Sequence, residues 1–108
     1  MDVEFRFLRG RKQKKVCEMK YRFDYTTKFK KDYRKLTDQK IIRELDIVID
    51  KLLNGETLEA KYQDHPLLGN YKGCRDCHIR PDVVLIYKKE EDILVLTALR
   101  VGTHSELF

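Results

Sequence analysis

The protein has 108 residues, of which 42% are hydrophobic and 38% are charged, as expected for one small globular domain with a single core. No apolar run approaches the roughly 18 residues that a membrane-spanning helix needs, and the start, MDVEFRFLRGRKQKKVCEM, lacks the apolar region and cleavage site of a secretory signal. We therefore expect a cytoplasmic protein, and its net charge of +5 favours a polyanionic partner.

The basic residues are concentrated at the start of the chain. Residues 1–18 hold six of the 23 Lys and Arg but only three of the 18 Asp and Glu. The stretch RGRKQKK within them has no apolar side chain to bury, and its like charges repel. We predict that residues 1–18 are a basic extension, either disordered or the product of an upstream start, and that the folded domain spans residues 19–108.

The domain is expected to begin with a strand and a helix. The alternating aromatic residues of MKYRFDY, residues 19–25, predict a half-buried strand. After two threonines that can cap a helix, Phe29, Tyr33 and Leu36 recur at helical spacing. The other face of this helix is basic, and it is either a solvated face or a phosphate-binding one. Its residues are Lys28, Lys30, Lys31, Arg34 and Lys35.

A second helix and three strands follow. Seven apolar residues at 3.6-residue spacing predict a helix over residues 38–54. After a polar link, strand-like runs cover residues 71–79, 82–88 and 93–100. Their short connections imply an antiparallel meander. The expected fold is therefore α+β, in the order β-α-α-β-β-β, with a helical hairpin on one face of the sheet and the other face open.

The segment Cys74 to His78 reads C-x-x-C-H, the attachment pattern of a c-type haem. In a strand, Cys74 and Cys77 point to opposite faces, whereas a haem or a redox dithiol needs both sulfurs together. A zinc site from Cys74 and the three histidines is the stronger metal alternative, but its spacing fits no paired-ligand pattern. We interpret both cysteines as free thiols that pack in the sheet, and we expect no cofactor and no metal.

All three histidines, His65, His78 and His104, lie in the last 44 residues. Asp76 shares a strand face with His78, and Asp82 follows the next turn. A histidine can take or give a proton near neutral pH. RNA cleavage without a metal needs a base for the 2'-OH, an acid for the leaving 5'-oxygen, and cations to stabilise the phosphorane. The cations available near these histidines are Arg75, Arg80 and Arg100.

The sequence from Tyr62 to Phe108 resembles the YafQ branch of the RelE/ParE toxins of bacterial toxin-antitoxin systems. The resemblance is carried by the blocks DHPLLG, RDCHIRPDVVLIY and GTHSELF, in the family's order and spacing. It implies a RelE-like α+β fold and a ribosome-dependent endonuclease that cuts mRNA in the decoding site. It also implies an antitoxin that neutralises the toxin and, as a complex with it, binds operator DNA. The basic extension before Met19 is not part of the family pattern.

The resemblance also implies which residues act. The family's functional positions fall on His65, Asp76, His78, Asp82, His104 and Phe108. In this interpretation His78 and His104 are the acid and base, and His65 contacts the phosphate. The two carboxylates orient the imidazoles or the ribose, and the terminal aromatic ring stacks on a splayed base. The basic helix face and the three arginines would contact RNA phosphates.

Two other functions fit the same fold. ParE-type toxins act on DNA gyrase and lack this set of histidines, so the fold alone does not define the target. A catalytically inactive module that binds nucleic acid or the antitoxin, with structural histidines, is the non-enzymatic alternative.

Overall fold

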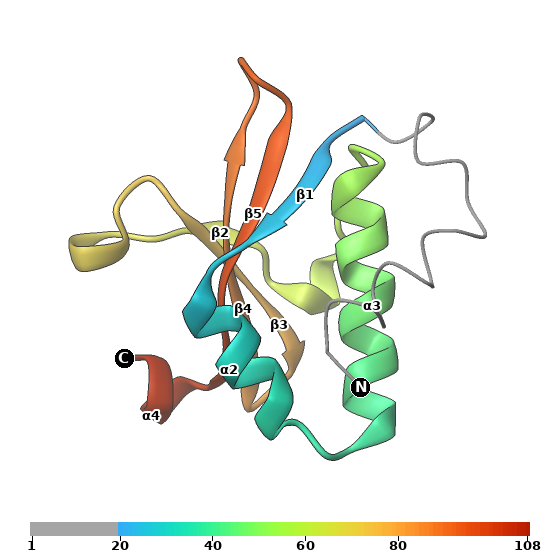
Figure 1. The fold of residues 1–108 in the computed structure, drawn as a ribbon, viewed down its shortest axis with the longest axis vertical. Coiled ribbons are helices and arrows are strands. Elements are labelled where there is room, and N and C mark those ends of the chain that lie inside the picture. Colours follow the sequence, from blue (N-terminus) through green and yellow to red (C-terminus); the bar gives the residue numbers. More distant parts are fainter. Residues whose placement is uncertain (1–19) are drawn as a thin grey trace.

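A computed structural model describes residues 20–108, and the extension predicted over residues 1–18 lies outside the described residues. Figure 1 shows two helices packed on one side of a twisted sheet, with a short helix at the carboxyl end beside its lower end. The elements are β1 (Arg22–Tyr25), α2 (Thr27–Lys35), α3 (Gln39–Leu53), β2 (His65–Pro66), β3 (Arg75–Arg80), β4 (Val83–Glu90), β5 (Val95–Thr103) and α4 (His104–Leu107), with short 3-10 turns η2 (Ala60–Tyr62) and η3 (Gly69–Tyr71).

The five strands form one sheet in the order β1-β5-β4-β3-β2. The predicted α+β class and element order are confirmed, but β1 pairs with β5 in parallel rather than antiparallel. The predicted strand at residues 71–79 begins later, at Arg75, because η3 and a turn with a positive φ of 90° at Gly73 occupy the preceding residues. Two further elements, β2 and α4, were not predicted, because they are only two and four residues long.

The two long helices form where their caps and apolar spacing predicted them. Thr26 caps α2 by accepting the Phe29 N–H at 3.0 Å, and its hydroxyl donates to the Leu99 carbonyl of β5 at 2.7 Å. Asp38 caps α3 by accepting the Lys40 N–H at 2.9 Å. The first cap therefore also attaches α2 to the sheet.

The main core lies between the sheet and these two helices. Phe29, Leu45 and Tyr87 are among its largest side chains, and none is more than 1% exposed. Burial of a side chain such as Phe29 or Leu45 contributes roughly 1.5–3 kcal/mol. No helix among residues 20–108 is long and apolar enough to cross a membrane.

A smaller apolar cluster lies on the other face of the sheet. Val84 and Ile86 of β4 pack there against Leu107 of α4, with Tyr71 and Cys74 from the loop that precedes β3. This face is therefore partly covered, whereas the sequence analysis expected it to be open. The loop and α4 lie on the same side of the sheet in Figure 1.

Candidate active site

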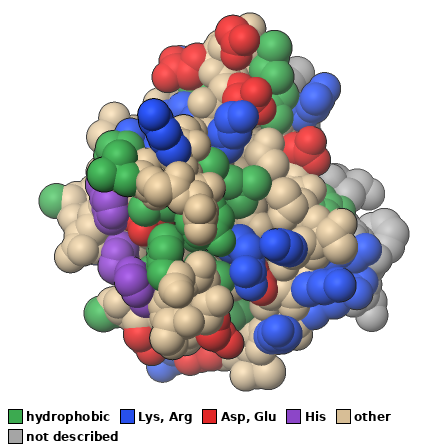
Figure 2. All heavy atoms as spheres, turned by 90° about the vertical axis from the view of Figure 1, so that its left-hand side faces the viewer, with side chains coloured by type: hydrophobic (Ala, Val, Ile, Leu, Met, Phe, Trp, Pro, Cys, Tyr) green, Lys and Arg blue, Asp and Glu red, His purple; other side chains and the backbone are tan. Residues whose placement is uncertain are grey.

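Three short elements carry the histidines on the face opposite the long helices. His65 lies in β2, His78 in β3, and His104 begins α4. The ring centroids of His65 and His78 are 6.4 Å apart. Figure 2 shows histidine side chains grouped at one side of this surface, beside hydrophobic side chains. The fold thus gathers residues that are as much as 39 positions apart in the chain.

His65 and Asp76 are partners in the register between β2 and β3. The Nε2 atom of His65 lies 3.0 Å from Oδ1 of Asp76, without the alignment of a hydrogen bond. Its Nδ1 atom lies 2.7 Å from the carbonyl oxygen of Gln63. Both ring nitrogens therefore face acceptors when Asp76 is ionised, whereas a neutral imidazole has only one N–H. The ring of His65 is thus held between a backbone carbonyl group and the carboxyl group of Asp76.

Asp76 is the buried centre of this group, with a side chain that is 3% exposed. Burial raises the pKa of its carboxyl group, and the charged forms of His65, His78 and His104 oppose that rise. All three histidines thus lie within electrostatic reach of one carboxylate. This arrangement brings together four of the six residues expected to act.

The carboxyl end is held in place rather than frayed. Thr103 and Glu106 form a capping box on α4, and Leu107 is buried on the sheet. The Phe108 ring is half exposed, with its centroid 4.5 Å from that of His104 and 5.6 Å from that of Tyr71. The ring is therefore positioned next to a candidate acid-base group.

The remaining expected residues lie apart from this group. Asp82 is exposed in the turn between β3 and β4, and within residues 20–108 no hydrogen bond or ion pair joins it to a histidine. Arg75 donates to Asp64 at 3.2 Å, and Arg100 forms two hydrogen bonds with Asp32, at 2.8 and 2.9 Å. Both arginines already have carboxylate partners, so their expected contacts with RNA stay a prediction.

The two carboxylate partners were missed by the sequence analysis. Asp64 also accepts the Tyr87 hydroxyl at 2.6 Å, and Asp32 also accepts the Val101 N–H at 3.2 Å. Two features of the sequence could have indicated them. Asp32 is a polar residue on the apolar face of α2, and Asp64 directly precedes His65.

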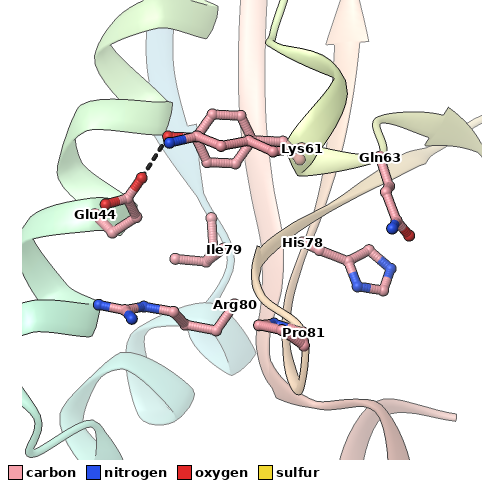
Figure 3. A pocket seen from close by; sticks show the side chains of 8 residues that line it. Glu44, Lys61, Gln63, His78, Ile79, Arg80 and Pro81 are labelled. Atoms are coloured by element: carbon pink, nitrogen blue, oxygen red, sulfur yellow. Dashed lines mark hydrogen bonds between the residues drawn. The ribbon is translucent and has the colours of Figure 1, made fainter.

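Arg80 lines a cavity of ≈ 380 Å³ between α3, η2 and the end of β3. Figure 3 shows Arg80 reaching towards α3 on one side of the cavity, and the ring of His78 beside Gln63 on the other. Glu44 and Lys61 also line it. Neither of these two residues was predicted from the sequence, because nothing local indicates that α3 and η2 approach the end of β3.

The basic residues of α2 are turned outward, as predicted. Lys28, Lys31, Arg34 and Lys35 are exposed, and Lys30 is half-buried. They follow the helix face opposite Phe29 and Tyr33, so they leave a positive surface beside the sheet.

The two cysteines of the C-x-x-C-H segment point apart. Cys77 is fully buried in the main core, while Cys74 packs in the smaller cluster on the other face, as the strand alternation predicted. Burial raises the pKa of both thiols, which keeps them protonated. Among residues 20–108, no group of three or more His, Cys, Asp or Glu side chains is arranged to hold a metal ion.

Comparison with known proteins relates the whole described domain to one family. The family model described as the bacterial toxin of a type II toxin-antitoxin system, YafQ, matches residues 21–108. The mRNA interferase toxin YafQ of Escherichia coli strain K12 is 38% identical over 87 residues, which cover 79% of this chain and 92% of that protein.

Solved structures agree with this relationship. The crystal structure of YafQ from E. coli strain BL21(DE3) superposes with a TM-score of 0.72 at 36% identity, covering 82% of this chain and 98% of that one. The toxin in the crystal structure of the E. coli DinJ-YafQ complex gives a TM-score of 0.71 at 36% identity, with the same coverage.

Proposed function

The chain belongs to the YafQ family of toxins of bacterial type II toxin-antitoxin systems, and from this premise we propose how it acts as an mRNA interferase: it cleaves mRNA on the ribosome, in the cytoplasm, by metal-free acid-base catalysis. The observation that carries this proposal is the convergence of three histidines around the buried carboxyl group of Asp76. The gyrase-directed alternative lacks support, because the named relatives are mRNA interferases.

The proposed reaction is attack of a ribose 2'-oxygen on the adjacent phosphorus. One histidine of the pair His78 and His104 takes the 2'-OH proton, and the other gives a proton to the 5'-oxygen as the bond from phosphorus to that oxygen breaks. The products are a 2',3'-cyclic phosphate and a 5'-hydroxyl. His65, whose ring lies beside Asp76, would act on the phosphate region, where its protonated form would balance charge on the phosphorane.

The surrounding residues would position the substrate. The exposed half of the Phe108 ring offers a stacking surface for a splayed base, an interaction worth roughly 1–3 kcal/mol per base. Asp82, in its exposed turn, would contact the ribose once mRNA is bound. The basic surface of α2 would contact ribosomal RNA phosphates, and its binding would weaken as salt concentration rises.

An antitoxin would neutralise the protein as a complex. One solved structure of the relative is that of the E. coli DinJ-YafQ toxin-antitoxin complex, and we propose that this chain likewise forms a complex with a cognate antitoxin. Contact with operator DNA would then occur only through that complex.

The direct test is primer extension on a defined mRNA bound to purified 70S ribosomes, with wild type and His104→Ala in parallel. New 5' ends within the decoding-site codon are expected with wild type and not with the variant. A folded wild-type protein that leaves the mRNA intact on the ribosome contradicts the proposal.

Removal of metal tests the acid-base chemistry separately. EDTA should leave the cleavage rate unchanged at a magnesium concentration that still holds the ribosome together. Activity that disappears and returns only with added zinc would contradict a metal-free reaction.

A further inference from the structure

The cavity that Arg80 lines is large enough for a small ligand. Its volume of ≈ 380 Å³ lies in the lower part of the range of roughly 300–1,000 Å³ found for small-molecule sites. His78 forms part of its wall. The cavity therefore adjoins one of the two proposed acid-base groups.

One side of the cavity is cationic and incompletely paired. Arg80 and Lys61 both line it. The Nε atom of Arg80 is buried and has no hydrogen-bond partner among the described residues. A buried guanidinium N–H without an acceptor is costly, and a phosphate oxygen in the cavity would supply that acceptor.

A fixed acceptor lies on the α3 side of the cavity, towards which Arg80 also reaches. Glu44 accepts a short hydrogen bond from the Tyr62 hydroxyl, and Figure 3 shows this bond at the α3 side of the cavity. The pKa of Tyr62 is raised to about 12, mainly by burial and secondly by this bond with Glu44. Its hydroxyl group therefore stays protonated and remains a donor. The bond holds the carboxylate in one place, and an ionised carboxylate only accepts hydrogen bonds.

We propose that this cavity binds one nucleotide of the mRNA next to the scissile phosphate. Arg80 and Lys61 contact its phosphate, and the Glu44 carboxylate accepts from an exocyclic amine of its base. Adenine, cytosine and guanine carry such an amine, whereas uracil presents carbonyl oxygens on both sides of its N3–H and is repelled by a carboxylate. The inference rests on the proposed function and adds a site of base selection to it.

The first test measures base selection on the ribosome. Cleavage rates are compared for mRNAs that carry each of the four bases at each nucleotide flanking the cut. At one of these positions wild type should cut the uridine substrate about tenfold more slowly than the others. Glu44→Gln, whose amide can also donate, should reduce that difference below about threefold, and Glu56→Gln, an exposed control, should retain it. Equal rates for all bases in wild type, or an unchanged uridine penalty in Glu44→Gln, would overturn the proposal.

The second test measures binding without the ribosome. Backbone amide shifts of the full chain are followed by NMR as AMP, UMP or inorganic phosphate is added. AMP should shift Lys61, Gln63 and Arg80 at concentrations about tenfold lower than UMP does. Arg80→Gln should weaken AMP binding about tenfold, while Arg43→Gln, exposed on α3, should not.

The two experiments separate failure of the inference from failure of the proposed function. A wild type that cuts mRNA on the ribosome but shows no AMP shifts at these residues would overturn the cavity alone. Shifts that inorganic phosphate reproduces at the same concentration would also overturn it, because they would mean that the base is not read. A wild type that binds AMP in the cavity but cuts no mRNA would overturn the proposed function instead.

Discussion

The packed side of the sheet and its histidine face differ in how their polar groups are paired. Where α2 meets β5, Asp32 accepts three hydrogen bonds, from Arg100 and from the Val101 N–H, and on the packed side Asp64 joins Tyr87 and Arg75. On the histidine face, the Asp76 side chain is 3% exposed, against 8% for Asp32 and 22% for Asp64, yet among the described residues its Oδ1 atom has only a poorly aligned contact with His65. Asp32 and Asp64 are thus held by protein donors, whereas Asp76, in the group proposed for catalysis, keeps its Oδ1 atom without a hydrogen bond within residues 20–108.

The largest expected effect tests the histidine face. His78→Gln should lower the cleavage rate on programmed ribosomes roughly 100- to 10,000-fold, the range for loss of a general acid or base. The free energy of unfolding in urea should change by less than about 0.5 kcal/mol, because the ring is only partly buried. Ser105→Ala, an exposed neighbour of His104, is the control and should retain the wild-type rate. A folded, fully active His78→Gln would contradict the acid-base assignment.

The reverse behaviour is expected on the packed side. Leu45→Ala removes a fully buried side chain of α3 and should lower the free energy of unfolding by about 2–5 kcal/mol. Cleavage per folded molecule should stay close to wild type. Ile47→Ala on the same helix, where the side chain is 48% exposed, should cost much less. Equal losses in the two variants would show that the core is not where the structure places it.

Breaking the ion pair between Arg100 and Asp32 tests whether Arg100 stabilises the fold or binds RNA. Asp32→Asn keeps the shape of the side chain but removes its charge, and it should cost about 2 kcal/mol in urea unfolding, since hydrogen bonds to charged groups contribute roughly 1.5–3 kcal/mol. If Arg100 is structural, cleavage per folded molecule should be unaffected. A rate that changes more than tenfold while stability is unchanged would instead assign Arg100 to RNA binding.

The smallest effect concerns the dependence of stability on pH. Because burial raises the pKa of Asp76, the folded state binds this proton more tightly than the unfolded state. The stabilisation is fully present below the ordinary Asp pKa of about 3.9 and is lost as pH rises through the folded pKa, by at most about 1.4 kcal/mol per pH unit. Asp76→Asn should therefore gain stability relative to wild type as pH rises above about 4, measured by urea unfolding at a series of pH values. A constant difference across this window would contradict the shift.

The sequence by itself determined the helices, the β-α-α-β-β-β order and the type of residue at the site. Strong local signals account for this: Asp38 caps a long amphipathic helix, and apolar runs mark β4 and β5 as strands. The blocks around His65, His78 and His104 pointed to the family. Because histidine can take or give a proton near neutral pH, these blocks indicated acid-base chemistry.

The tertiary structure decided what depends on contacts between distant residues. Pairing of β2 with β3 placed His65 against Asp76, and packing of α4 on β4 brought His104 and Phe108 to the same face. The parallel pairing of β1 with β5, the partners of Arg75 and Arg100, and the cavity with Glu44 and Lys61 carry no local signal. Each of them depends on the approach of segments that the sequence keeps apart, and such an approach is set by packing of the whole core rather than by the propensity of any one stretch.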